Sequence, residues 1–225
     1  PDGVVYLSAF AYKYKGTMAE GTTLALLDGT TDVCDRAFNN CWNLAGIDLP
    51  ESLKTIGKEA FSGTGLLSVS LPSRIDSIGE SAFSGCDKLV SATLPETLTT
   101  IPASMFSRCY ALAAISIPAS VEYIGDEAFY SCLGLKEITS FNPVPPVCEP
   151  FFGENWTMVF DGVNLEHCTL KIPTSSTASY AAAVGWDMFY LCEEFDPSGI
   201  QGVLKGKASG KTVHYDLNGR MIPSD

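Results

Sequence analysis

Cysteine is the first candidate for chemistry, because the chain contains eight of these residues. An even number of cysteines in a small secreted chain can form a disulfide framework. However, Cys41, Cys86, Cys109 and Cys132 share one position of a repeated segment, and Thr64 holds that position in another copy. Stacked copies present their side chains in parallel rather than converging, which disfavours disulfide geometry. We therefore expect buried, reduced thiols that pack as small apolar side chains.

The other cysteines point to no metal site. Structural zinc is usually held by Cys pairs two to four residues apart, whereas Cys34 and Cys41 are seven apart and no such pair occurs. Cys148, Cys168 and Cys192 lie off the repeat period, and the sequence leaves open whether they form a disulfide. The sequence thus predicts neither a metal site nor a cofactor.

No catalytic motif emerges from the remaining nucleophiles and bases. The only histidines are His167 and His214. His167 precedes Cys168, but neighbouring side chains on a strand point to opposite faces and cannot form a nucleophile–base pair. The segment 205–212, KGKASGKT, imitates a phosphate-binding loop. Its glycines enclose three residues where that loop needs four, so we interpret it as a flexible linker. We expect a protein that is not an enzyme.

The charge of the chain excludes several partners. Lysine and arginine number 14 against 26 acidic residues, giving a net charge of −12. A nucleic-acid partner is disfavoured, because phosphate binding needs a basic face. No apolar run approaches the roughly 20 residues that span a membrane. Because the chain starts at Pro1 without a Met or signal peptide, we expect a mature or trimmed chain from which any targeting segment has been removed.

A repeat of 22 or 23 residues organises most of the chain. Phenylalanines recur at spacings of 23, 22, 23 and 23 residues, at Phe38, Phe61, Phe83, Phe106 and Phe129. The half-repeat I-G-x-x-A-F-x-x-C predicts a short helical turn with one buried face, and the half-repeat L-x-x-I-x-L-P predicts a half-buried strand of about four residues. Such units are stable only when stacked. The predicted fold class is an α/β solenoid with one short parallel strand and one short helical turn per repeat.

The ends of the array deviate from the repeat. We expect a solenoid over residues 1–195, followed by a separate tail over 196–225 that is rich in Gly, Lys and Ser. Within the solenoid, residues 1–32 are expected to form an N-terminal cap, and residues 141–195 an irregular C-terminal cap repeat. Trp186 and Phe189 are expected to close the last apolar face.

The outward side chains of the predicted sheet are the main binding candidates, since repeat proteins commonly bind on such a surface. They are mostly small and polar, and comprise Asp48, Ser68, Ser70, Ser91, Thr93, Ser116, Glu137 and Thr139. An aromatic patch in the insertion is a rival candidate, but we favour the interpretation in which it fills the core of the C-terminal cap. Its members are Phe151, Phe152, Trp156 and Phe160.

The repeat units resemble a known family. IGESAFSGCDKLVSATLP at 78–95 and IGDEAFYSCLGLKEI at 124–138 resemble BspA-type leucine-rich repeats of bacterial surface proteins, over about residues 15–192. The segment HYDLNGRM resembles the start of a C-terminal tail in secreted proteins of Bacteroidetes. Three positions depart from the repeat, namely Thr64, Ala92 and Pro102.

The resemblance implies a leucine-rich-repeat solenoid that is secreted or held at the cell surface and that binds rather than catalyses. It also implies the class of partner: a host matrix protein, a glycan or another bacterial surface protein. Our leading hypothesis is therefore an adhesion or binding module acting through the repeat surface. The alternative hypothesis is a structural spacer or scaffold that presents another module.

Overall fold

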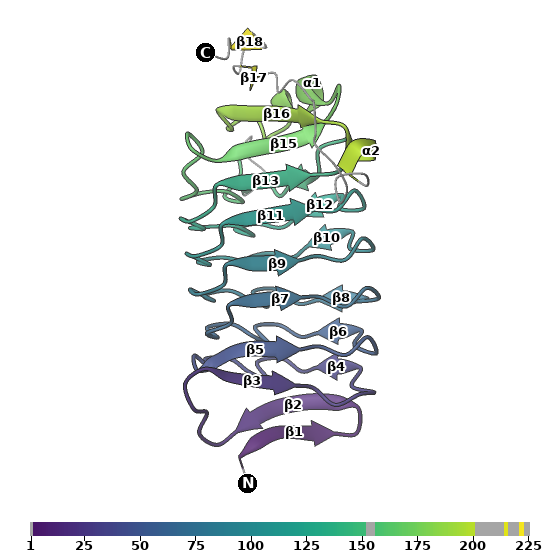
Figure 1. The fold of residues 1–225 in the computed structure, drawn as a ribbon, viewed down its shortest axis with the longest axis vertical. Coiled ribbons are helices and arrows are strands. Elements are labelled where there is room, and N and C mark those ends of the chain that lie inside the picture. The colour runs from purple at the N-terminus through teal and green to yellow at the C-terminus, as the bar shows by residue number, and fades with distance from the viewer. Residues whose placement is uncertain (1, 152–155, 201–213, 216–220, 223–225) are drawn as a thin grey trace.

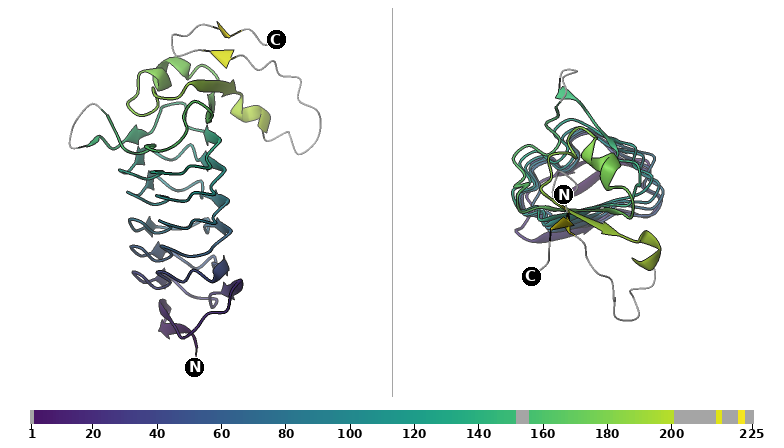
Figure 2. Two further views of the ribbon diagram at one scale, coloured as in Figure 1. Left: turned by 90° about the vertical axis from the view of Figure 1, so that its left-hand side faces the viewer. Right: turned by 90° about the horizontal axis from the view of Figure 1, so that it is seen from above.

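The computed structural model describes residues 2–151, 156–200, 214–215 and 221–222. The chain winds into stacked coils that superimpose when seen along the long axis (Figures 1 and 2). Each coil contributes one strand to the front face, which we call the front sheet. Among the described residues it consists of an eight-stranded hydrogen-bonded sheet and, at the N-terminal end, a separate two-stranded one. The front strands are β3 (Thr22–Ala25), β5 (Leu44–Asp48), β7 (Ser68–Ser70), β9 (Ser91–Thr93), β11 (Ala114–Ile117), β13 (Glu137–Ser140), β15 (Thr169–Pro173) and β16 (Leu191–Phe195).

A second set of short strands, which was not predicted from the sequence, forms the back face, which we call the back sheet. In the described part of the chain its strands fall into two hydrogen-bonded sheets, one of five strands, two of which form an N-terminal hairpin, and one of three. The short strands are β4 (Asp32–Val33), β6 (Thr55–Ile56), β8 (Ser77–Ile78), β10 (Thr100–Ile101), β12 (Tyr123–Ile124) and β14 (Val147–Cys148). Equivalent positions of successive coils pair in parallel on both sheets, for example Ile115 with Ile138 and Ile138 with Leu170. The extra residues of the insertion lie between β14 and Phe160, so they leave the register of the front sheet intact.

The predicted helical turn in each repeat is wrong. Residues 34–41 and their equivalents are turns. Their backbone N–H groups donate alternately to a carbonyl in the next coil and to a carbonyl in the same turn. The N–H of Phe38 donates to the carbonyl of Ala60 in the next coil, whereas the N–H of Asn39 donates to the carbonyl of Arg36. Arg36 and Asn40 have positive φ values of 58° and 59°, which an α-helix does not allow. The segment gives up helical bonds and gains bonds between coils, so the fold is a β-solenoid.

The core is organised as ladders along the axis. Six buried phenylalanine rings stack with centroid spacings between 5.2 and 5.9 Å, at Phe38, Phe61, Phe83, Phe106, Phe129 and Phe160. Five of them are the repeat phenylalanines of the sequence. Phe160 is the sixth ring of this stack, so this member of the aromatic patch fills the core.

The cysteines form a second ladder beside the first. Cys86, Cys109 and Cys132 are fully buried, as predicted, and Cys41 is half-buried. The three buried thiols each donate to the carbonyl of the phenylalanine one coil earlier, at 3.1–3.2 Å. All eight cysteines are free, including Cys148, Cys168 and Cys192, whose pairing the sequence left open.

Both ends of the array are covered. At the N-terminal end, the antiparallel hairpin of β1 (Gly3–Leu7) and β2 (Phe10–Lys15) extends the back sheet by pairing β2 with β4. At the C-terminal end, Trp186 and Phe189 pack against Phe160 and close the apolar interior, as predicted. The helix α1 (Thr177–Ala181) lies in this cap.

Part of the predicted tail continues the front sheet. After α2 (Pro197–Ile200), the backbone of β17 (His214–Tyr215) pairs antiparallel with β16, and β18 (Met221–Ile222) pairs with β17. The segment 205–212, with its phosphate-loop-like sequence, lies outside the described residues. The division of the chain at residues 195 and 196 stays a prediction.

Candidate functional site

The predicted binding residues lie in two rows on the outward face of the front sheet. Strand pairing aligns Ser68 with Ser91, and Ala114 with both Ser91 and Glu137. In the second row it aligns Ser70 with Thr93, and Ser116 with Thr139. The rows exist because side chains alternate between the two faces of each strand, while parallel register repeats that alternation from coil to coil.

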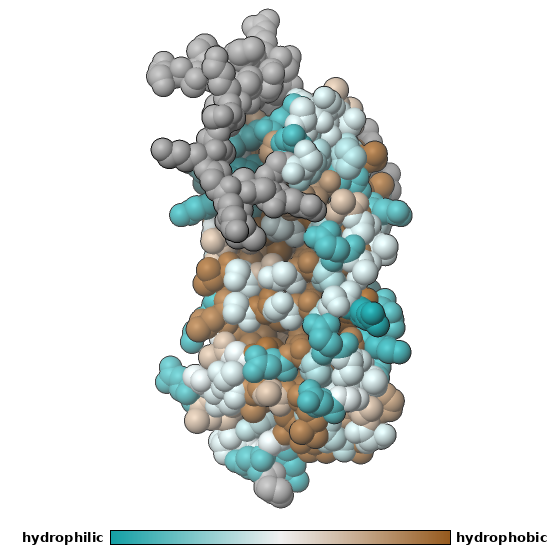
Figure 3. Space-filling model, turned by 45° about the vertical axis from the view of Figure 1, so that its right-hand side comes forward, coloured by the Kyte–Doolittle hydropathy of each residue, from teal (hydrophilic) through white to brown (hydrophobic). Residues whose placement is uncertain are grey.

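The N-terminal part of this face offers only small side chains. Asp48, Ser68, Ser70, Ser91 and Thr93 are exposed on β5, β7 and β9. Figure 3 shows pale small side chains in rows beside brown apolar ones over these coils. These five side chains are short, polar and open to water, so this part of the face is a polar surface.

The C-terminal part of the same face is hollowed, and we call this hollow the front groove. Its volume is about 350 Å³. It brings together three of the predicted residues and five residues that the sequence analysis did not select. The lining residues are Ser116, Glu137, Thr139, Phe141, Lys171, Glu193, Glu194 and Phe195.

An ion pair crosses the floor of the front groove. Lys171 Nζ lies 2.6 Å from Glu137 Oε2, and the two side chains are 34% and 40% exposed. The Thr139 hydroxyl donates to the other Glu137 oxygen at 3.4 Å. Because the pair is open to water, its own contribution to stability is small. Its charges remain accessible to a ligand that brings complementary groups.

Glu194 lines one wall of the groove and accepts hydrogen bonds from the C-terminal cap. Its carboxylate accepts bonds from the Thr177 hydroxyl at 2.7 Å and from the Thr177 backbone N–H at 3.2 Å. Burial opposes the charge, but these bonds and those from the backbone N–H groups of Ser175 and Ser176 outweigh it and lower the pKa of Glu194. Glu194 therefore holds the start of α1 as a carboxylate.

Two aromatic rings supply the apolar part of the groove. Phe141 and Phe195 meet edge to face, with ring centroids 5.3 Å apart and planes at 74°. Both rings are half-buried. The groove thus combines hydroxyl groups, carboxylates, one ammonium group and an apolar wall, as small ligand sites and peptide-binding clefts do.

The other sequence candidates fall elsewhere. Within the aromatic patch, Phe151 and Trp156 pair with ring centroids 4.3 Å apart, and Trp156 is 48% exposed. Phe152 lies outside the described residues. Cys168 is buried, whereas the His167 ring is exposed and contacts Asn164 at 3.2 Å, so the two side chains are not a catalytic pair.

The described residues show neither a metal-binding cluster nor a membrane-spanning helix. Within the described ranges, no group of three or more His, Cys, Asp or Glu side chains is placed to hold a metal ion. Among the same residues, no helix combines the length and the apolar character needed to cross a bilayer.

Lys171 and Glu193 of the groove were missed in the sequence for identifiable reasons. Strand pairing places Lys171 beside Thr139, and Glu193 beside Lys171, so all three belong to one row. The Leu170–Pro173 signature was a usable signal for Lys171, although the insertion displaces it from the period. The sequence of β16, LCEEF, lacks the strand signature and gave no signal for Glu193.

The stacked coils, the two parallel sheets and the apolar ladders define a β-solenoid of the leucine-rich-repeat class. The chain belongs to the BspA-type leucine-rich repeat family, since the model described as BspA type Leucine rich repeat region matches residues 22–155 in six copies. No curated protein matches the chain.

Solved structures of bacterial leucine-rich repeat proteins are similar to the chain. One is the leucine-rich repeat protein of T. pallidum, with 31% identity and a TM-score of 0.53, covering 58% of this chain and 62% of that one. Another is a leucine-rich repeat protein from Eubacterium ventriosum, with 19% identity and a TM-score of 0.55, covering 69% of this chain and 46% of that one. The chain therefore spans less than two thirds of either protein.

Proposed function

We propose that this chain is a non-catalytic binding module of an exported or cell-surface bacterial protein, and that it recognises a protein or glycan partner through the front groove. The single observation that carries the proposal is the groove itself. There the rows of small polar side chains give way to a hollow of about 350 Å³ that offers both charges, hydroxyl groups and two aromatic rings. Membership of the BspA-type family supports a binding role and a surface location.

The groove suits a polar partner better than the remainder of the front face does. Interfaces usually depend on a few anchoring side chains, and serine and threonine are seldom among them. The groove places Phe141 and Phe195 next to the Glu137–Lys171 pair, so apolar and charged contacts are available within one site. A sugar or a polar peptide segment presents both kinds of surface.

Matched substitutions on the two sheets test the proposal. Thr139→Arg places a bulky cation in the groove, whereas Thr100→Arg makes the same change at an exposed position of the back sheet. The wild-type chain and both variants would be screened against immobilised matrix proteins, glycans and bacterial surface extracts. We expect a partner bound by the wild type and by Thr100→Arg, with binding by Thr139→Arg reduced at least tenfold.

Two results would count against this function. Equal loss of binding in both variants would place the contact elsewhere. A screen in which the folded wild type retains no partner would favour the alternative, a spacer or scaffold. The small polar side chains on β5 to β9 would suit that role.

A further inference from the structure

A second hollow lies on the back sheet at the opposite end of the solenoid, and we call it the N-terminal pocket. Its volume is about 470 Å³, within the range of small-ligand sites. Side chains of the β1–β2 hairpin form one wall, and the first coils form the rest. The residues that matter here are Phe10, Tyr12, Asp32, Cys34, Asp35 and Gly57.

The aromatic wall is exposed. Phe10 and Tyr12 stand on the outward face of β2, and each ring is 44% exposed. Strand pairing sets Phe10 directly beside Asp32. The ammonium group of Lys13 already lies 5.7 Å from the centroid of the Tyr12 ring. The Tyr12 ring therefore already carries the cation of Lys13, and the exposed Phe10 ring offers the second aromatic face.

Hydrogen bonds hold the two carboxylates of the pocket in place. Asp32 Oδ2 accepts from the Thr31 hydroxyl at 2.6 Å, and Asp35 Oδ1 accepts from the backbone N–H of Lys58 at 2.7 Å. Gly57 makes the second contact possible, because a Cβ at this position would lie 2.5 Å from Asp35 Oδ1. Both carboxylates are thus oriented before any ligand arrives.

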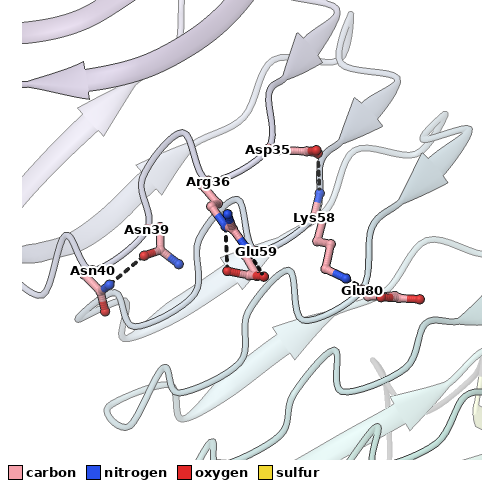
Figure 4. Close-up of polar contacts among 7 residues, drawn as sticks. All are labelled: Asp35, Arg36, Asn39, Asn40, Lys58, Glu59 and Glu80. Atoms are coloured by element: carbon pink, nitrogen blue, oxygen red, sulfur yellow. Dashed lines mark hydrogen bonds and ion pairs between the residues drawn. The ribbon is translucent and has the colours of Figure 1, made fainter.

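The neighbouring cations Arg36 and Lys58 form ion pairs with carboxylates outside the pocket. Figure 4 shows Arg36 directed to Glu59 and Lys58 directed to Glu80. Arg36 donates to both Glu59 oxygens at 2.8 and 2.9 Å, and Lys58 Nζ lies 2.7 Å from Glu80. Among the described residues, neither carboxylate of the pocket forms an ion pair.

The negative field of these carboxylates reaches the wall of the pocket. Burial first, and then the charges of Asp32 and Asp35, raise the pKa of the Cys34 thiol. Cys34 is half-buried and free, so its reactivity reports on whatever enters the pocket.

We propose that the N-terminal pocket binds an arginine side chain of a partner peptide, between the exposed rings of Phe10 and Tyr12 and the carboxylates of Asp32 and Asp35. A guanidinium group is planar, stacks on aromatic faces and donates two parallel bonds to a carboxylate. The pocket supplies an aromatic face and fixed acceptors side by side, and its charge is opposite to that of arginine. This site is separate from the front groove and does not depend on the function proposed for it.

Calorimetric titration with a short capped peptide that carries two arginines, Ac-GRARG-NH2, tests this site. Its matched probe replaces both arginines with citrulline, which keeps the shape and removes the charge. We expect the arginine peptide to bind and the citrulline peptide to bind at least tenfold more weakly. We also expect Asp32→Asn to weaken binding of the arginine peptide about tenfold, since a charge-assisted bond contributes roughly that much. Phe10→Ala should weaken it about threefold, since an exposed ring contributes roughly that much to holding a cation.

Control variants separate the pocket from the general negative charge of the chain. Tyr110→Ala removes an exposed ring elsewhere, and Asp76→Asn removes an exposed carboxylate outside the pocket. Both should bind the arginine peptide like the wild type. Bound peptide should also slow alkylation of Cys34 by a bulky maleimide at least threefold, with Cys41 as the internal reference.

The outcomes divide clearly. Selective loss in Phe10→Ala and Asp32→Asn, together with protection of Cys34, supports the site. Lack of binding by the arginine peptide, equal binding of the citrulline peptide, equal loss in the control variants, or unchanged Cys34 labelling in the complex would overturn it.

Discussion

The phenylalanine ladder makes a sharp prediction for Phe83→Ala. Phe83 is fully buried and stacks on Phe61 at 5.3 Å and on Phe106 at 5.9 Å. The substitution removes the ring from the middle of the ladder and leaves a cavity between two coils. Because each coil is stabilised mainly by its neighbours, the damage falls on both interfaces of one coil.

The magnitude follows from burial and stacking. Truncating a buried phenylalanine to alanine costs about 3–5 kcal/mol through lost transfer free energy and the cavity. Each stacked ring pair contributes roughly 0.5–1.5 kcal/mol of its own. Phe38 ends the ladder and stacks only on Phe61 among the described rings. We therefore expect Phe38→Ala to destabilise the chain by about 1 kcal/mol less than Phe83→Ala.

Urea unfolding followed by tryptophan fluorescence measures these differences. Tyr110→Ala is the control, because the Tyr110 ring is 46% exposed and its loss should change stability by about 0.5 kcal/mol or less. A cost of Phe83→Ala below about 1 kcal/mol, or one equal to that of Tyr110→Ala, would refute the stacked core.

Three further predictions concern the thiols, the glycines and the tail. Burial raises the pKa of Cys86 to about 11 and that of Cys132 to about 12, from an ordinary value of 9.0. Because the thiols of the unfolded chain ionise first, stability to urea should be retained below pH 9 and fall as the pH rises toward these values. A Cys86→Ala variant should lose less stability than the wild type between pH 8 and pH 10. An equal loss would contradict the burial of this thiol. Gly57→Ala should lower the melting temperature clearly more than Gly46→Ala. A Cβ at position 57 would lie 2.5 Å from backbone, whereas a Cβ at position 46 would lie 3.1 Å from the Thr23 side chain. Similar melting temperatures would refute this close approach at Gly57. A chain truncated to residues 1–196 should keep its melting temperature within a few degrees, since β17 pairs with β16 through two residues within the described part of the tail. A drop of ten degrees or more would show that the tail is a true cap.

Much of the core could be predicted from the sequence, because the signal was repeated. Five phenylalanines at one period identify one ladder position, and the same spacing locates the front strands and their outward rows. Parallel stacking then fixes which side chains become neighbours. Phe160 escaped this reasoning because the insertion displaces it from the period, although it occupies the same ladder.

The local conformation between the strands could not be predicted in the same way. Apolar residues at positions 1, 5, 6 and 9 of the half-repeat suit a helical turn as well as they suit the observed turns. Two features decide for turns over a helix. They are the positive φ values at residues such as Arg36 and Asn40, and the hydrogen bonds that this coil makes to the next coil. The back strands contain two residues each, too few to show an alternating pattern.

The two hollows depend on pairings that lie outside the regular repeat. The front groove needs β16 beside β15, and the N-terminal pocket needs the hairpin strand β2 beside β4. Neither β16 nor β2 carries the repeat signature. Their neighbours could be identified only once the ends of the array were folded.

Hydrogen exchange of the chain with a captured partner tests the central claim most directly. Backbone amides of β11, β13, β15 and β16 surround the front groove, whereas those of β6, β8 and β10 lie on the opposite sheet. Binding should slow exchange in the first set and leave the second unchanged. Protection confined to the back sheet, or a bound partner that protects neither set, would contradict recognition through the front groove.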